Sequence, residues 1–340
     1  MNNSTEQNQT KPFDVVVMGE ILVEVATDVA FGHGVPAQLG VSGDALNVAA
    51  AAAAAGARVG LLSVLPDDDL GKAIAARIRE LGISAELLKF RAGQQGVYLV
   101  HCDPQGQREF SYARSGSVGS TLAPEDVAPS VFSAAGAVIA GGIACAISAS
   151  SRAAVLKAAA LSRRFVFDPN FRPRLTSVED ATAVLAELAP RTFLVTPSFP
   201  GETSALLGCA SPKEAAAKLR SLGAANVAVT CGAEGIQLAG DQLDRDQLAG
   251  DEPEGDQDSA WIDAIPAPSV VDQTGAGDAF VGTLTARLVL GDSLPVAARY
   301  GAAAASLVVG GKGGTGLIPT FEQTSAHAQP APEGELSSLA

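Results

Sequence analysis

Short apolar runs and helical patterns alternate along residues 13–81, and this alternation restricts the possible fold more than any other feature. Residues 13–18 and 59–64 are apolar runs typical of buried strands. Residues 43–55 and 72–81 have helical patterns, and each is followed by a glycine that can end a helix. A strand–helix–strand–helix order is typical of a parallel sheet with helices on its faces. The sequence therefore predicts the α/β class.

Two β-like segments interrupt this order. Residues 97–101 and 108–114 flank a turn at 103–106, and the pattern predicts a β-hairpin. A hairpin inserted between βα units suggests a lid or a small second sheet. The strand–helix order then resumes, and further strands are expected at 137–140, 164–168, 192–196, 226–231, 235–239 and 261–265.

Charge and composition exclude several classes of protein. The formal net charge is −14 and there is no cluster of Lys and Arg, which argues against a nucleic-acid partner. The four cysteines are scattered without a C-x-x-C pair, as expected for free thiols in a reducing compartment. The polar residues 1–11 lack a signal-peptide pattern, and no apolar run is long enough to span a bilayer. We expect a cytoplasmic protein with no membrane partner.

Three segments read as mobile. Residues 240–259 are rich in Asp and Glu and lie between two expected strands, so we interpret them as an acidic, disordered loop insertion. An acidic loop that binds or stores metal is the alternative. Residues 1–11 and 321–340 are expected to be flexible tails, the second because it is rich in Ala, Pro, Glu and Ser.

A strand-to-helix turn at residues 270–280 carries the strongest chemical signal. Gly275 and Gly277 flank Ala276 and let the backbone approach a ligand closely. The N–H groups at the start of the following helix would form an anion site. Asp278 stands beside that site, where a carboxylate suits the task of taking a proton from a hydroxyl that attacks phosphorus. The alternative is a capping acid on an ordinary glycine turn.

Other catalytic motifs are missing or lack their context. The Gly-Lys pairs at 71–72 and 311–312 are not followed by Ser or Thr, which excludes a Walker A loop. Residues 311–316 fit G-x-G-x-x-G, but no helix follows, so a dinucleotide site is not expected. The three histidines are not spaced as zinc ligands, and 116–119 has the wrong spacing for a G-x-S-x-G elbow.

Four further places carry polarity that suits a ligand, and each also has a plain reading. Residues 43–47 begin a helix, where capping is the alternative. Tyr112 and Arg114 alternate on the hairpin and share a face that suits a sugar or a carboxylate, unless it is an exposed edge. Residues 168–174 and 230–235 follow strand ends, where α/β sheets bind ligands, but both could be ordinary turns.

Taken in order, these residues resemble the ribokinase-like (PfkB) family of carbohydrate kinases over residues 13–320. The family's signature D-x-T-G-A-G-D is met by Asp272, Thr274, Gly275, Ala276, Gly277 and Asp278. Residues 43–60 match its second signature, a glycine turn and an Asn that open a helix. The resemblance implies a three-layer α/β/α domain over residues 12–320, with a small β-sheet lid inserted from about 20–42 and 94–116.

Within the family, the sequence is most similar to 2-keto-3-deoxygluconate kinases, through residues 42–47, 112–117, 141–144 and 167–175. That similarity implies an acidic sugar whose terminal hydroxyl receives the γ-phosphoryl of ATP. Arginines suit such a carboxylate. The implied substrate residues are Gly43, Asp44, Asn47, Tyr98, Tyr112, Arg114 and Arg172.

The resemblance also implies roles in catalysis and nucleotide binding. Asp278 would be the base, and the N–H groups of Gly275, Ala276 and Gly277 would stabilise the phosphoryl oxygens. Mg²⁺ would bridge the phosphates, with Glu202 ordering its waters, and the family allows K⁺ near the last loop. A homodimer or higher homo-oligomer would form through the lid. The implied nucleotide residues are Asp168, Asn170, Thr230, Gly232, Gly235, Thr274, Gly277 and Ala303.

Two positions depart from the family pattern, and two rival functions remain open. The family's N-x-x-E motif is Phe199-Pro200-Gly201-Glu202 here, which lacks the Asn, and Ser42-Gly43 replaces a Gly-Gly pair. One rival is a kinase for another sugar, such as fructose or 5-keto-2-deoxygluconate. The other is a non-catalytic sugar- or nucleotide-binding regulator, which would not need the base Asp278.

Overall fold

A computed structural model of the protein describes residues 12–102, 108–241, 243 and 258–329. The main sheet has eight strands in the order β14-β13-β12-β11-β10-β9-β1-β4. The six strands from β12 to β4 pair in parallel, and β13 and β14 extend the sheet as an antiparallel hairpin. The strands are β1 (Val15–Met18), β4 (Val59–Leu62), β9 (Ala137–Gly141), β10 (Phe165–Asp168), β11 (Leu194–Val195), β12 (Asn226–Thr230), β13 (Gly235–Gly240) and β14 (Ser259–Asp263).

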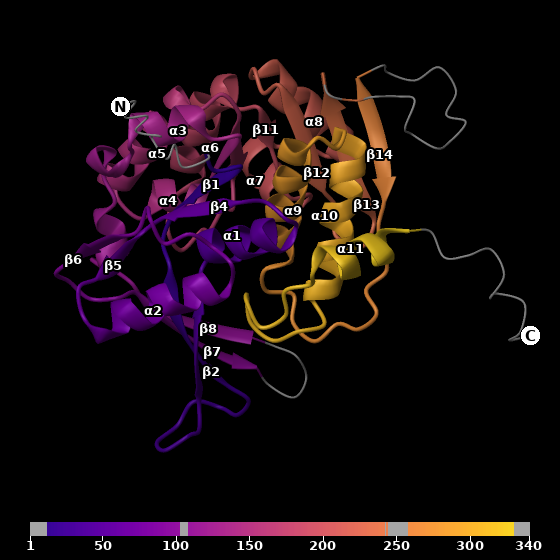
Figure 1. Ribbon diagram of the computed structural model, residues 1–340. Coiled ribbons are helices and arrows are strands. Elements are labelled where there is room, and N and C mark those ends of the chain that lie inside the picture. The colour runs from indigo at the N-terminus through magenta and orange to yellow at the C-terminus, as the bar shows by residue number, and fades with distance from the viewer. Residues whose placement is uncertain (1–11, 103–107, 242, 244–257, 330–340) are drawn as a thin grey trace, which may run out of the picture.

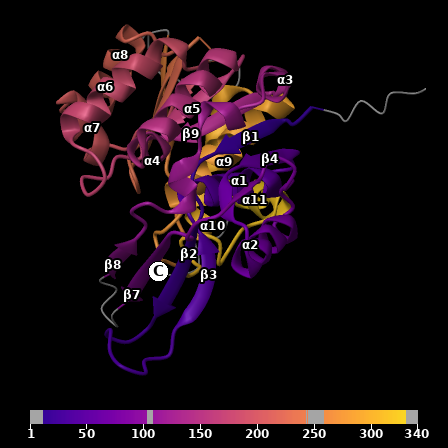
Figure 2. The same ribbon diagram turned by 90° about the vertical axis from the view of Figure 1, so that its left-hand side faces the viewer.

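Helices cover both faces of this sheet, as Figures 1 and 2 show. Alternate residues of the strands point to opposite faces, so Val16 of β1 joins one core and Val15 joins the other. The core that contains Val16 includes α3 (Pro129–Ala134), α5 (Ala149–Leu161), α6 (Val178–Leu188), α7 (Gly201–Leu207) and α8 (Pro212–Ser221). The core that contains Val15 includes α1 (Asp44–Ala54), α2 (Asp69–Glu80), α9 (Ala276–Leu290) and α10 (Leu294–Val308). The predicted three-layer α/β/α fold is confirmed.

A second sheet of four strands projects from the carboxyl end of the main sheet (Figure 1). Its order is β3-β2-β7-β8, and it includes the predicted hairpin as β7 and β8. The central pair, β2 and β7, is parallel, and the outer pairs are antiparallel. These strands, which we call the small sheet, are β2 (Leu22–Thr27), β3 (Gln38–Ser42), β7 (Val97–Cys102) and β8 (Arg108–Ala113).

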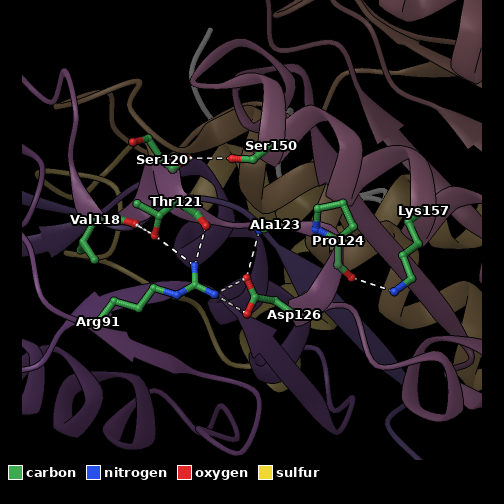
Figure 3. Close-up of polar contacts among 9 residues, drawn as sticks. All are labelled: Arg91, Val118, Ser120, Thr121, Ala123, Pro124, Asp126, Ser150 and Lys157. Carbon is green, nitrogen blue, oxygen red and sulfur yellow. Dashed lines mark hydrogen bonds and ion pairs between the residues drawn. The ribbon is translucent and has the colours of Figure 1, made fainter.

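A polar network joins the chain just before the hairpin strands of the small sheet, β7 and β8, to the chain just after them (Figure 3). Arg91 ends the short strand β6 (Lys89–Arg91), which pairs with β5 (Val64–Pro66). Its guanidinium donates to both carboxylate oxygens of Asp126, at 2.6 and 2.8 Å, and to the carbonyl oxygen of Thr121 at 2.5 Å. Thr121 and Asp126 lie in the short 3-10 helices η1 (Val118–Thr121) and η2 (Pro124–Asp126).

The C-terminal segment differs from the expected flexible tail. Phe321–Ala328 forms helix α11, which begins with a capping box in which Thr320 and Gln323 each accept a hydrogen bond from the other's backbone N–H. The ring centroids of Phe321 and Tyr300 lie 5.2 Å apart. The guanidinium carbon of Arg287 lies 4.1 Å from the centroid of the Phe321 ring. An aromatic anchor therefore orders a segment whose composition predicts mobility.

Two other expectations of mobility fall mainly outside the described residues, namely residues 1–11 and most of the acidic stretch 240–259. Among the helices that the structure describes, none is both long enough and apolar enough to cross a membrane.

Candidate active site

Four of the predicted site residues converge where the carboxyl end of β10 meets the amino ends of α1 and α9, namely Asp44, Asn47, Asp168 and Asp278. The two helices pack closely because Gly282 of α9 lies against the backbone of α1. A Cβ on Gly282 would be 2.3 Å from the carbonyl oxygen of Val48, so only glycine fits there. Segments from both ends of the chain thus meet at one edge of the sheet, where open α/β sheets bind ligands.

Asp278 lies half-buried on the first turn of α9, and the side chain of Asn47 holds it. The amide nitrogen Nδ2 of Asn47 donates to Oδ2 of Asp278 at 2.8 Å. Burial and the nearby charge of Asp44 raise the pKa of Asp278 to about 7, against the opposing effects of Asn47 and Arg172. A carboxyl group with such a pKa is matched to proton transfer near neutral pH.

The turn before α9 is shaped by glycine and by the buried carboxylate of Asp272. Gly275 has a φ of +84°, a left-handed conformation that favours glycine. Oδ1 of Asp272 accepts the backbone N–H of Thr274 at 2.6 Å, and Oδ2 accepts that of Gly313 at 2.8 Å. No atom lies within 4 Å of the place where a Cβ of Gly277 would stand. The amino end of α9 therefore has open space beside it, as an anion site requires.

Carboxyl groups outnumber guanidinium groups around Asp278. Burial raises the pKa of Asp44, and the charges of Arg114 and Arg172 lower it. Burial and then the charges of Glu202 and Asp278 raise the pKa of Asp168 well above its ordinary value. A bound cation would reduce the repulsion among these carboxylates. In the part of the chain that the structure describes, however, no group of three or more Asp, Glu, His or Cys side chains could hold a metal ion alone.

Glu202 already has hydrogen-bond donors, which the sequence did not reveal. Its Oε1 accepts the backbone N–H of Phe171 at 2.6 Å. Its Oε2 accepts the backbone N–H and the hydroxyl of Ser198 at 2.8 and 3.0 Å. Glu202 therefore fixes the turn after β10, in which Asn170 adopts a φ of 39° and Arg172 follows. One lone pair on Oε1 remains for a water, whereas both lone pairs of Oε2 are used by Ser198.

The small sheet places its aromatic residues and Arg114 next to one another. The buried Tyr98 donates its hydroxyl to the carboxylate of Glu24, and its ring centroid lies 5.9 Å from that of Tyr112. Arg114 follows β8 directly, and its guanidinium carbon lies 5.9 Å from the centroid of the Tyr112 ring. Arg114 also forms an ion pair with Glu20, the residue just after β1 and Gly19.

Sequence reasoning overlooked Glu20, Glu24 and Ser117. A signal for Glu20 was present, because a carboxyl group that directly follows a buried parallel strand must lie at the ligand-binding edge of the sheet. Glu24 and Ser117 gave no comparable signal, since their roles depend on contacts with Tyr98 and Glu20 that are distant in sequence.

Residues predicted to contact a nucleotide are spread more widely. Thr230 ends β12, and Gly235 begins β13, so with Gly232 they form the turn between these strands. Ala303 lies fully buried in α10 and presents no surface to a ligand in this structure. Asn170 and Arg172 also line a cavity of about 460 Å³ that extends between α4 (Gly142–Ala146), α5 and α6. Asp278 and Asp44 are not among the residues that line it.

Comparisons with known proteins identify the family and the fold. The profile of pfkB family carbohydrate kinases matches residues 13–320. A 2-dehydro-3-deoxygluconokinase of Thermoproteus tenax is 33% identical over 284 residues, which are 82% of this chain and 82% of that protein. A PfkB protein from Polaromonas sp. JS666 is 26% identical, with a TM-score of 0.79 over 92% of this chain and 99% of that one. A proposed ribokinase II from E. coli, solved with ATP and Mg²⁺, has the same fold at 21% identity and a TM-score of 0.79, over 92% of this chain and 98% of that one.

Proposed function

Because the chain belongs to the pfkB family of carbohydrate kinases, we propose that it transfers the γ-phosphoryl group of ATP to the terminal hydroxyl of 2-keto-3-deoxygluconate, with Asp278 as the base. One observation carries this proposal. Asp278 is fixed by Asn47 at the amino end of α9, has a pKa of about 7, and stands beside the open space at Gly277. A base and an anion site in contact are what phosphoryl transfer to an alcohol requires.

In the proposed reaction, Asp278 accepts the proton of the attacking hydroxyl as its oxygen bonds to the γ-phosphorus. The bond from that phosphorus to the β,γ-bridging oxygen breaks, and ADP leaves with the bonding electrons. The backbone N–H groups at Gly275, Ala276 and Gly277 would face the phosphoryl oxygens, where the positive end of the α9 dipole stabilises negative charge. Because Asn47 donates to Oδ2, the other oxygen of Asp278 remains for the sugar hydroxyl.

The proposed substrate rests on two arginines and on the relative from Thermoproteus tenax, whose name gives the same sugar acid under its other name. Arg172 follows the turn after β10. Its one hydrogen bond within the described residues goes from Nη1 to the carbonyl oxygen of Phe171, at 3.1 Å, so its charge is available to a carboxylate. Arg114 approaches from the small sheet, above the ring of Tyr112. Two guanidinium groups from opposite sides suit a sugar acid.

Magnesium fits the same edge of the sheet as a partner of the phosphates. Mg²⁺ usually keeps several waters and binds through one or two carboxylates together with substrate phosphates. Asp168 and Glu202 would hold it there, either directly or through water. When bound, the ion neutralises phosphate charge and would relieve the repulsion that raises the pKa of Asp168.

A second candidate is a kinase for a neutral ketose such as fructose. The ion pair between Glu20 and Arg114 favours it, because a paired guanidinium offers a carboxylate less net charge than a free one. Under this reading Arg172 would be a surface charge.

A coupled ADP-release assay with ATP and Mg²⁺ tests the proposal. We expect 2-keto-3-deoxygluconate or its galactonate epimer to be strongly preferred over fructose, ribose and 5-keto-2-deoxygluconate. Asp278→Asn should lower kcat by about 10²–10⁴-fold with little change in sugar affinity, since the isosteric amide cannot accept the proton. A preferred neutral sugar would overturn the substrate, and an unchanged kcat in Asp278→Asn would overturn the base.

A further inference from the structure

We propose that Glu20 is a positioning residue for sugar binding, which acts by holding Arg114 against the site. This inference rests on the proposed sugar-kinase function but not on which sugar is preferred. Glu20 directly follows β1, the strand that leads into the small sheet, whereas Arg114 lies where the chain leaves that sheet. The pair therefore connects two of the segments that carry the small sheet.

Glu20 is one of the most completely buried charged residues that the structure describes. Only 1% of its surface is exposed, and its carboxylate has two side-chain donors. Oε1 accepts the hydroxyl of Ser117 at 2.5 Å, and Oε2 accepts Nη2 of Arg114. A buried carboxylate without such partners would strongly destabilise the fold. Arg114 and Ser117 therefore offset the cost of burying the Glu20 carboxylate.

Two glycines shape the space around this carboxylate. A Cβ on Gly96 would lie 3.0 Å from Oε1 of Glu20, and a Cβ on Gly119 would lie 2.6 Å from its Cγ. Gly96 precedes β7, and Gly119 lies in η1 after β8. Glu20 is therefore enclosed by the chain that enters the hairpin and the chain that leaves it, so that its carboxylate has little freedom to reorient.

Arg114, by contrast, is not saturated with acceptors. Only 11% of its side chain is exposed, and its Nε is buried without a hydrogen-bond partner among the described residues. Its partner Glu20 lies against the start of α1, because a Cβ on Gly43 would be 2.8 Å from the carbonyl oxygen of Glu20. In keeping with this position, the charge of Arg114 lowers the pKa of Asp44. An unsatisfied buried donor costs about 1–3 kcal/mol, so an added acceptor such as a sugar oxygen would be favourable.

The network in Figure 3 shows what a purely structural pair looks like in this protein. Arg91 and Asp126 form a bidentate ion pair, and Asp126 also accepts the backbone N–H of Ala123 at 3.0 Å. Arg91 donates further to the carbonyl oxygen and hydroxyl of Thr121. That pair is well supplied with partners, and none of these hydrogen bonds involves Glu20 or Arg114. In the pair of Glu20 and Arg114, by contrast, Nε of Arg114 has no acceptor among the described residues, and this difference is why we assign the pair a ligand-directed role.

The decisive experiment is a double-mutant cycle that combines Glu20→Gln with Arg114→Ala. In the otherwise unchanged protein, Glu20→Gln should raise the sugar KM, and the sugar Kd measured by calorimetry, about tenfold, which corresponds to about 1.4 kcal/mol. The KM for ATP and kcat should stay within about twofold. In the Arg114→Ala background, Glu20→Gln should have almost no further effect on sugar affinity, because contacting residues that act together are non-additive.

Asp126→Asn is the matched control, since it removes the charge of a buried carboxylate that also pairs with an arginine. It should lower the thermal midpoint without changing sugar KM. Ser117→Ala, which removes the other donor to Glu20, should raise sugar KM in the same direction by about two- to threefold. It provides an independent test if Glu20→Gln does not fold.

Additive effects in the cycle, or an unchanged sugar Kd in both Glu20→Gln and Ser117→Ala, would overturn the proposal. Equal losses in Asp126→Asn would reduce Glu20 to a structural role. The cycle is measured with the sugar that the panel assay prefers. A neutral preferred sugar would therefore overturn the proposed substrate and leave the Glu20 proposal standing.

Discussion

Four carboxyl groups at the site have a pKa above the ordinary value, namely those of Glu20, Asp44, Asp168 and Asp278. Burial is the largest cause for each of them. The groups differ in what compensates the charge. Glu20 has Arg114 and Ser117, and Asp278 has the amide of Asn47. Asp278 combines a pKa of about 7 with a position on the first turn of α9.

The pH dependence of turnover follows from the pKa of Asp278. Asp278, as the proposed base, must be unprotonated to act, so kcat/KM for the sugar should rise with pH and level off above the pKa of about 7. Because the pKa of Asp278 in the folded state is above the ordinary value of 3.8, the folded protein binds more protons than the unfolded chain between these two pKa values. The contribution of Asp278 to the free energy of unfolding is therefore lost as pH rises towards 7. Comparing pH–rate and pH–stability profiles with those of Asp278→Asn checks both. A wild-type rate that is flat from pH 5 to 8 would contradict the assignment.

Asn47→Ala should separate orientation from chemistry. The amide of Asn47 favours the ionised form of Asp278, so its removal should move the rise in kcat/KM to higher pH and lower kcat at pH 7 by about tenfold. The control is Asn226→Ala. Asn226 is buried elsewhere and donates from Nδ2 to the carbonyl oxygen of Phe193 at 2.9 Å. It should lower stability and leave the pH profile in place, and an equal shift in both variants would remove Asn47 from this role.

At the scale of single elements, the proposed mechanism requires α9 to be both a helix and a phosphate site. Gly277 lowers its helical stability, because glycine costs about 1 kcal/mol relative to alanine within a helix. Nothing within 4 Å would obstruct a Cβ there. Gly277→Ala should therefore keep or slightly raise the thermal midpoint, while ATP KM rises and kcat falls because the methyl group enters the space for the phosphate. Unchanged kinetics would place the phosphate elsewhere.

Helix α11 provides a second test at this scale. A chain that ends at Thr320 loses the packing of Phe321 on Arg287 and Tyr300, together with the hydrogen bond from Nε of Arg299 to the carbonyl oxygen of Ala328. Burial of one phenylalanine contributes about 2 kcal/mol, so the thermal midpoint should fall by roughly 5 °C. A chain that ends at Gln329 is the comparison, since it keeps every described contact of α11. Equal midpoints would show that α11 does not contribute to stability.

The strands and helices of the main sheet could be predicted because each carries its own periodicity. Residues 59–64 were expected as one strand and form two, β4 and β5, because the chain bends at Ser63 to reach a second partner, β6. Helix α11 could not be foreseen, since it depends on an aromatic contact made by Tyr300 in a different helix. The positions of Asp278, Asn47 and Arg172 follow from the fold class. The pair of Glu20 and Arg114, which are 94 positions apart, could be found only from tertiary structure.

At the scale of the whole molecule, the small sheet is connected to the main domain by a few short crossover segments. Its strand β3 carries the exposed apolar side chain of Leu39, at 72% exposure, and self-association through this sheet stays a prediction. The sugar would touch both parts at once, with Tyr98 and Arg114 on one side and Asp44 and Arg172 on the other. Closure of the small sheet over the sugar would exclude water from the phosphoryl transfer.

Amide hydrogen exchange should detect that closure. The preferred sugar is expected to increase protection in β2 and β7 and to leave the buried strands β9 and β10 unchanged, because the latter are already at the centre of the main sheet. Arg114→Ala should remove most of the gain in protection. Equal protection with and without sugar would mean that the small sheet does not respond to binding.

The hydrogen bond between Asn47 and Asp278 joins residues that lie 231 positions apart, and β1 lies between β4 and β9 in the sheet. During synthesis, β1 cannot pair with β9, and α1 cannot pack against α9, until these later elements have been made. Contacts of this range form slowly and late. A chain released from the ribosome before α9 would carry much of the sugar-binding surface but neither the phosphate turn nor the base. The connectivity of the fold would thus keep incomplete chains from consuming ATP.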